Sequence, residues 1–264
     1  MKGSGYNARG NMRYVKRFFV LVFVIFLLPA IASAGLWAIR DKPSNWREAK
    51  WSSSGLLPKA DDQKDAAVYV FSAMTGGFKG ALASHAWIVT KERNAARYNR
   101  YDKVGWGNPI RVNNYPPDAF WYSNPPRQVI AIKGDEAERL IPKIEKAIAA
   151  YPYAKQGGYQ IYPGPNSNTF VAHVLRSVPE LGVALPPDAV GRDYVPNAAL
   201  FHVDDDWKDV HVSWRGLIGV AAGVRSGFEV HLLGLVAGID VVNPGIKIPG
   251  LGWFGMQRTG NIAI

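Results

Sequence analysis

The sequence predicts an α+β domain that follows an N-terminal apolar helix and ends in a glycine-rich β tail. Three observations support this: a 22-residue apolar run at 18–39, short β-type and helical apolar runs between 66 and 203, and ten glycines between 211 and 255. At 264 residues with 48% hydrophobic content, the chain can bury one substantial core. We divide it into a signal or membrane anchor at 1–39, a tether at 40–65, the α+β core at 66–203, and a β extension packed on that core at 204–264.

The apolar run from Phe18 to Ile39 is an export signal that is either cleaved or kept as an anchor. Five basic residues and no acidic residue precede it, which is typical of an amino end that stays inside the cell. Ala32-Ser33-Ala34 fits the small-x-small cleavage pattern, so release after Ala34 stays open. We favour the anchor, because the run can span a bilayer and continues past the cleavage pattern.

The charge distribution argues against a nucleic-acid partner. The formal net charge is +10, but five positive charges lie in the first 17 residues, and without the first 34 residues the charge is 10 − 5 = +5. This surplus is spread along the chain and forms no basic patch. The chain contains no cysteine, which excludes disulfides and thiol chemistry. We expect no cofactor and no metal.

The pattern of hydrophobic residues predicts the strands and the helices of the core. We expect strands at 66–74, 83–90, 101–106 and 128–133, with a mostly irregular proline-rich segment at 108–126. A helix is expected at 135–150, and Pro142 should kink it or mark its true start. Between 211 and 255 we expect short strands or hairpins, since Gly219-x-x-x-Gly223 and Gly234-x-x-x-Gly238 lie in segments too polar for membrane helices.

The stretch from Gly164 to Arg176 is where we place the chemistry. Gly164 and Pro165 break the preceding segment, and a helix should start among Asn166, Ser167 and Asn168. Counting about 100° per residue puts Ser167 on the buried face of that helix. A hydroxyl there, beside free N–H groups and the positive helix end, suits a nucleophile. Alternatively, Ser167 is a plain helix cap.

His85 and Asp102 are the candidate partners of Ser167. His85 is a lone imidazole within an apolar strand, which suits a general base, although a core histidine bonded to a carbonyl fits equally. Asp102 on the following strand could orient that imidazole, or lie on the surface. Together the three side chains could supply a nucleophile, a base and an orienting acid.

Two other constellations are weaker. The segment around His202 and His211 also holds four aspartates, but their spacing matches no calcium loop, and we interpret it as a solvated acidic turn. Aromatic side chains could line a groove for sugar or lipid, but core packing explains them equally well; they are Trp106, Trp121, Tyr122, Tyr151, Tyr153, Tyr159 and Tyr162.

Four motifs follow one another along the chain: Ser84-His85-Ala86-Trp87, Tyr101-Asp102-Lys103-Val104-Gly105-Trp106-Gly107, Tyr151-Pro152-Tyr153 and the run from Pro163 to Ala172. In order and wording they resemble domain-of-unknown-function family 3750, a group of uncharacterised bacterial proteins. The similarity covers about residues 45 to 255 and implies an envelope protein with no established activity. Together with the apolar run at 18–39, this predicts an inner-membrane protein with a single N-terminal anchor and the domain outside the cytoplasm, or a periplasmic protein after cleavage at Ala34.

A more distant resemblance is to circularly permuted papain-like enzymes of the lecithin retinol acyltransferase type. Their histidine strand is similar to the segment with His85, and their Asn-Cys-x-x-Phe-Val helix start is similar to Asn166-Ser167-Asn168-Thr169-Phe170-Val171. The resemblance implies a permuted papain-like fold, an antiparallel sheet packed on a helix that starts near Ser167. It implies Ser167 as nucleophile, His85 as base and Asp102 as orienting residue, with Asn166 and Asn168 serving the oxyanion or positioning. Ser167 stands where these enzymes carry cysteine, and a hydroxyl needs concerted base catalysis.

Two functions follow as expectations. The first is hydrolysis or transfer of an acyl or amide bond in an envelope peptide, cell-wall or lipid substrate, centred on Ser167 and His85. The second is a catalytically inactive binding or scaffolding module on the same fold. In both, residues 18–39 contact the membrane.

Overall fold

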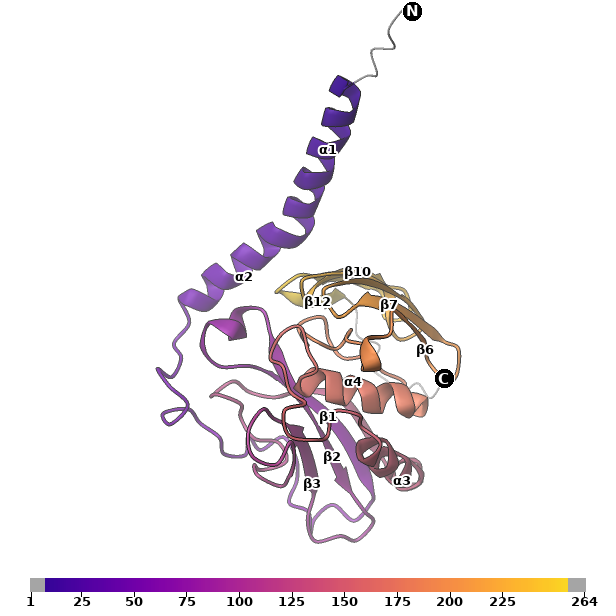
Figure 1. Ribbon diagram of the computed structural model, residues 1–264. Coiled ribbons are helices and arrows are strands. Elements are labelled where there is room, and N and C mark those ends of the chain that lie inside the picture. The colour runs from indigo at the N-terminus through magenta and orange to yellow at the C-terminus, as the bar shows by residue number, and fades with distance from the viewer. Residues whose placement is uncertain (1–7, 256–264) are drawn as a thin grey trace, which may run out of the picture.

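The computed structural model describes residues 8–255, which form a long helix attached to a body of two sheets (Figure 1). The helix runs through α1 (Ala8–Val22), a π-helical turn η1 (Phe23–Leu27) and α2 (Leu28–Ala38). Within the described residues, Met12–Ala38 is the one helix long and apolar enough to cross a membrane. The expected N-terminal apolar helix is therefore confirmed.

The C-terminal part of this helix is fixed to the body. The Ser33 hydroxyl lies 2.6 Å from the carbonyl oxygen of Ala81 and 2.8 Å from that of Gly250. Trp37 is 5% exposed, and its indole N–H donates to the Gly77 carbonyl over 2.9 Å. The first part of the helix projects away from the body, with most of its large apolar side chains exposed.

The first sheet has five antiparallel strands in the order β4-β3-β2-β1-β5. They are β1 (Ala67–Met74), β2 (Ser84–Lys91), β3 (Asn99–Lys103), β4 (Ile110–Val112) and β5 (Arg127–Lys133). The expected strands are present, but the third lies earlier than 101–106, because the chain turns after Lys103 and the Val104 N–H donates to the Pro109 carbonyl. Sequence patterning missed β4, a three-residue edge strand that follows directly on Pro109.

Alternation along β1 and β2 separates two buried layers. Val68, Val70 and Ile88 face the helices α3 (Asp135–Ala149) and α4 (Ser167–Ser177) in the main core. Tyr69, Phe71, Trp87 and Val89 point to the opposite face, where they form an aromatic layer with Tyr98 and Trp121. The 3-10 turn η2 (Gly77–Ala81) connects β1 to β2 and contacts α2, whereas α4 packs directly on β2. Pro142 lies inside α3, so the alternative that this helix starts at Pro142 is wrong.

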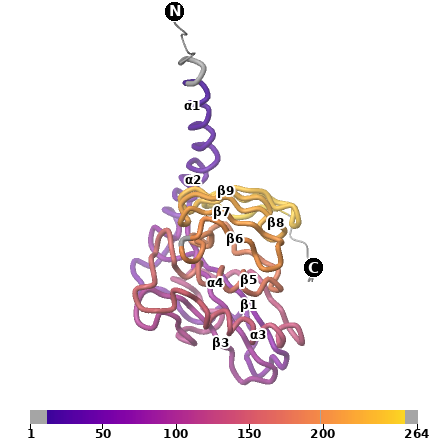
Figure 2. Tube along the Cα trace, turned by 45° about the vertical axis from the view of Figure 1, so that its right-hand side comes forward, coloured from indigo at the N-terminus to yellow at the C-terminus, as the bar shows by residue number. Residues whose placement is uncertain are grey.

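The second sheet is a meander of seven antiparallel strands, from β6 to β12 in order. Its strands are β6 (Phe201–Val203), β7 (Asp209–Trp214), β8 (Ile218–Gly223), β9 (Gly227–Leu232), β10 (Leu235–Asp240), β11 (Gly245–Ile248) and β12 (Gly252–Gly255). They confirm the short strands expected between 211 and 255, and the sheet begins three residues before the boundary expected at 204. The 3-10 turns η3 (Pro179–Leu181) and η4 (Pro196–Ala198) connect it to α4. In Figures 1 and 2, α4 lies between the two sheets.

Candidate active site

His85 and Asp102 are in direct contact. His85 lies near the start of β2 and Asp102 near the end of β3, and the His85 Nε2 atom is 2.9 Å from Asp102 Oδ1. Both side chains are buried, with Asp102 at 0% exposure and His85 at 5%. The structure thus brings together the two residues that the sequence suggested as base and orienting acid.

Arg100 is a third member of this cluster that sequence reasoning missed. Its guanidinium donates to both carboxylate oxygens of Asp102, Nε to Oδ2 over 2.7 Å and Nη2 to Oδ1 over 2.8 Å. Burial raises the pKa of Asp102, but Arg100 and His85 outweigh it and lower the pKa to about 2. The missed signal was strand alternation, since Arg100 and Asp102 are two residues apart and share one face of β3.

The surroundings of His85 keep its imidazole neutral. Burial lowers the His85 pKa and outweighs the contact with Asp102, which raises it. The ring stacks on Trp121 with centroids 3.8 Å apart and planes at 6°. Because Asp102 is ionised, Nε2 carries the proton that it donates to Oδ1, which leaves the lone pair of Nδ1 as the basic site of the ring.

Asn166 caps α4, the helix that begins with Ser167. The Asn166 side-chain oxygen accepts from the backbone N–H groups of Asn168 over 2.9 Å and Thr169 over 3.2 Å. The Thr169 hydroxyl accepts in return from the Asn166 N–H, which completes a capping box. Asn166 is therefore the cap, and Ser167 occupies the first helical position.

The side chain of Asn168 fastens α4 to the strand that carries His85. Its amide oxygen accepts from the Ala86 N–H over 3.0 Å, and its amide nitrogen donates to the Ser84 carbonyl over 2.8 Å. These two bonds bind the β2 backbone on either side of His85. The amide nitrogen also donates to the Val190 carbonyl over 2.9 Å, so every polar atom of this side chain is engaged.

Ser167 is 4% exposed, as expected for a side chain on the buried face of the helix. Its hydroxyl and backbone N–H lie close to the hydroxyl of Tyr159. Burial raises the pKa of Tyr159 and outweighs the opposing effect of Ser167, so this phenol stays protonated near neutral pH.

Tyr159 connects Ser167 to a cavity of about 260 Å³. The cavity wall also includes Lys103, Trp106 and Lys155. Lys103 is 1% exposed, its ammonium has no hydrogen-bond partner among the described residues, and burial lowers its pKa to about 8. The cavity is therefore positively charged near neutral pH.

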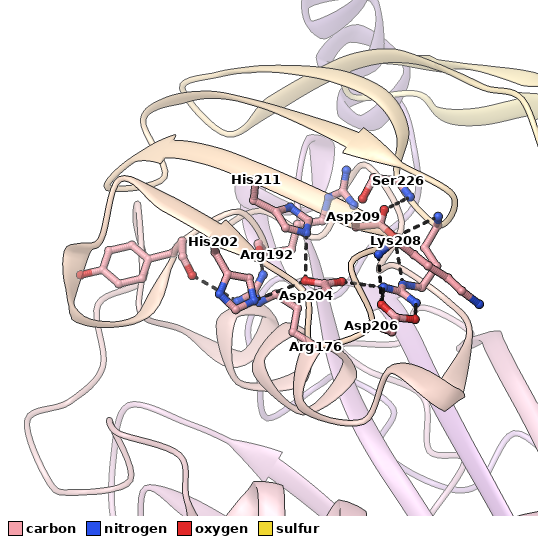
Figure 3. A network of polar contacts seen from close by, with 11 residues as sticks. Arg176, Arg192, His202, Asp204, Asp206, Lys208, Asp209, His211 and Ser226 are labelled. Carbon is pink, nitrogen blue, oxygen red and sulfur yellow. Dashed lines mark hydrogen bonds and ion pairs between the residues drawn. The ribbon is translucent and has the colours of Figure 1, made fainter.

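The segment around His202 and His211 is not the solvated turn that its composition suggested (Figure 3). Asp204 is 4% exposed, and its Oδ2 atom accepts from Arg225 over 2.9 Å while Oδ1 lies 3.3 Å from the Nε2 atom of each histidine. Asp209 is 1% exposed and also bonds Arg225. The interpretation was wrong because the second sheet encloses these carboxylates against α4. Within residues 8–255, no group of three or more potential ligands is arranged to hold a metal ion.

Residues 65–194 match the model of a family described as protein of unknown function (DUF3750). No curated protein and no solved structure matches the chain.

Proposed function

The chain belongs to the DUF3750 family through residues 65–194, and we propose that it is a serine-type hydrolase or transferase of acyl or amide bonds. In this proposal Ser167 is the nucleophile, His85 the general base and Asp102 the residue that orients His85. Asn166 and Asn168 are positioning residues, because their side chains are fully engaged in holding the start of α4.

The observation that carries the proposal is the attachment of α4 by Asn168. This residue follows Ser167 directly and binds the backbone on both sides of His85. Ser167 and His85 therefore belong to one rigid unit, but among the described residues no hydrogen bond joins their side chains. In this proposal the general-base step needs them to approach within about 3 Å of each other.

The reaction would follow from the protonation states of these groups. Nδ1 of neutral His85 takes the Ser167 proton while Oγ forms a bond to the substrate carbonyl carbon. The leaving group departs with that proton from His85, which leaves an ester on Ser167. Water, or an acceptor hydroxyl or amine, then bonds the ester carbon as it gives a proton to His85. His85 passes this proton to Ser167 Oγ as the bond between Oγ and the acyl carbon breaks. Protonated Tyr159 can donate a hydrogen bond to the oxyanion of each tetrahedral intermediate.

The cavity beside Tyr159 supports a substrate that carries an anionic group. Lys103 and Lys155 lie in its wall, and a peptide carboxylate or a lipid phosphate would compensate their charge. Both groups occur in envelope peptides, cell-wall fragments and lipids, the substrate classes that the family resemblance suggested. We propose that the domain works outside the cytoplasm of a bacterium, at the inner membrane. The two contacts of the Ser33 hydroxyl with the body, which cleavage after Ala34 would remove, favour a retained anchor.

The papain-like arrangement is part of the same proposal. An antiparallel sheet with a histidine near the start of one strand, packed on a helix that begins with the nucleophile, is the arrangement that the distant resemblance implied. Serine would replace the usual cysteine in this chain.

Labelling with a fluorophosphonate probe tests the nucleophile. We expect the full chain in detergent to be labelled, and Ser167→Ala and His85→Gln to abolish labelling. Ser177→Ala is the matched control, because Ser177 ends the same helix and is exposed. Labelling that survives Ser167→Ala would rule out Ser167 as nucleophile.

A binding or scaffolding module is the second candidate, favoured by the contact between Arg100 and Asp102. Arg100 already neutralises the carboxylate that would stabilise a protonated His85, and Trp121 covers one face of the ring. In a Ser167→Cys variant the new cysteine is the sole thiol, because the chain has none of its own. A thiol pKa well below the usual value of about 8.5 that rises again in Ser167→Cys/His85→Gln would support the catalytic arrangement. A pKa that does not respond to His85 would favour the binding module.

A further inference from the structure

The second sheet has an outer face made of apolar residues. Cross-strand pairs such as Val212 with Val220 and Phe228 with Ile239 lie on this face. Its members are Phe201, Val203, Val210, Val212, Trp214, Ile218, Val220, Ala222, Phe228, Val230, Leu232, Leu235, Ala237, Ile239, Ile246, Ile248, Gly252 and Phe254. Many of these side chains are about half exposed, including Trp214 at 55% and Phe228 at 49%.

The opposite face of the same strands is polar and points toward α4. Along β9, Phe228 and Val230 point outward, whereas Glu229 and His231 point inward and are 1% and 3% exposed. The Glu229 carboxylate forms ion pairs with Arg192, His231 and Lys247. Figure 3 shows the neighbouring part of this inner layer, in which Asp204, Asp209 and Arg176 lie between the sheet and α4.

This polarity is the reverse of that in a water-exposed antiparallel sheet. Such sheets place apolar residues on the core and polar residues in water, whereas β structure in contact with lipid has an apolar outside and a polar inside. Seven strands about 4.8 Å apart, from about 10 to about 20 Å long, make this face roughly 500 Å² in area, which is at the upper end for apolar patches on soluble monomers.

We propose that the outer face of the second sheet rests on the bilayer that holds the N-terminal helix. The sheet lies in the plane of the membrane surface, with its apolar side chains in contact with lipid and its inner polar layer turned toward α4. The protein is thereby held at the membrane by two elements, the helix and the sheet.

The position of the helix identifies lipid as the occupant of this face. The η1 turn contacts β10, and Ser33 of α2 contacts Gly250 in the turn between β11 and β12. From there the helix projects beyond the sheet and away from the rest of the body, as the two views in Figures 1 and 2 show. A bilayer that surrounds the projecting apolar side chains of the helix therefore lies on the same side of the body as the outer face of the second sheet. Exposed Trp214 adds a residue that is enriched at membrane interfaces.

Fluorescence quenching in vesicles tests the proposal on the full chain. Single cysteines at Val220 and Phe228 would be labelled with a small fluorophore, and Lys146→Cys on α3 is the matched exposed control. The chain has no native cysteine, so each label occupies one site. The vesicles would consist of phosphatidylcholine with a fraction of nitroxide-labelled phosphatidylcholine, and iodide would be the aqueous quencher.

We expect labels at Val220 and Phe228 to be quenched several-fold more by the nitroxide lipid and several-fold less by iodide than the label at Lys146. All three positions are at the surface, so these substitutions remove no core packing. Labels at Val220 and Phe228 that are as accessible to iodide as the control would overturn the proposal. Protection from both quenchers, together with self-quenching between labelled chains, would also overturn it, because a second copy would then cover the face.

Discussion

Asp102→Asn should destabilise the protein strongly, because it removes the counter-ion of a buried arginine. Arg100 and Asp102 are both 0% exposed and are joined by two hydrogen bonds. Removing one partner of a buried ion pair typically lowers the free energy of unfolding by about 3–5 kcal/mol, because the other charge stays buried without a partner. Replacing both residues, as in Arg100→Met/Asp102→Asn, should cost less than the sum of the two single changes.

The same substitution should change the dependence of stability on pH. The Asp102 pKa is lowered from 3.8 to about 2 in the folded protein. A carboxylate whose pKa is lower in the folded than in the unfolded protein stabilises the fold. This stabilisation is complete at pH values above the unfolded-state pKa and is lost as the pH falls through the folded-state pKa. The Asp102 contribution should therefore be full above pH 4 and disappear toward pH 2, with a magnitude on the order of 2 kcal/mol.

The assay is chemical denaturation of the full chain in detergent, followed by tryptophan fluorescence between pH 2 and pH 6. The difference in free energy of unfolding between wild type and Asp102→Asn measures the contribution of the Asp102 carboxylate, because the other titrating groups are the same in both proteins. We expect this difference to be large at pH 6 and to shrink below pH 4. A difference near zero at pH 6, or one that stays constant down to pH 2, would refute the reasoning.

Three further substitutions test the inner layer of the second sheet and the start of α4. Glu229→Gln should cost about 3–5 kcal/mol in denaturant unfolding, because it leaves buried cations unpaired, and a neutral result would mean that they find other partners. Asn166→Ala should lower the melting temperature in calorimetry through a loss of about 0.5–2 kcal/mol, the usual cost of a helix cap, unless Ser167 can replace it. Gly191 has φ +92°, and an added Cβ would lie 2.4 Å from the Asn166 amide nitrogen. Gly191→Ala should therefore cost about 1–3 kcal/mol, and its cost should fall in the Asn166→Ala background; equal costs in the two backgrounds would contradict a clash with Asn166.

Local patterns in the sequence were sufficient for most elements of the fold. The apolar run at 18–39 and the alternation around His85 each depend on neighbours in the chain, so they can be read from the sequence. The choice of Asn166 over Ser167 and Asn168 as the cap of α4 could not be read in this way, because all three residue types can cap a helix. The segment with Asp204 could not be interpreted correctly, because its burial depends on Arg225 and on α4, which are distant in sequence. β4 was missed because pairing with β3 outweighs the proline-rich composition around it.

The sequence by itself determined the apolar helix, most of the short strands and the inward orientation of Ser167, because helix and strand periods decide which face a side chain occupies. Tertiary structure alone decided that Arg100 and His85 share the carboxylate of Asp102, and that Asn168 binds the strand of His85. It also decided that the charged face of the second sheet is buried and its apolar face exposed. The alternation along each strand predicts two unlike faces, but which face meets protein depends on the position of α4.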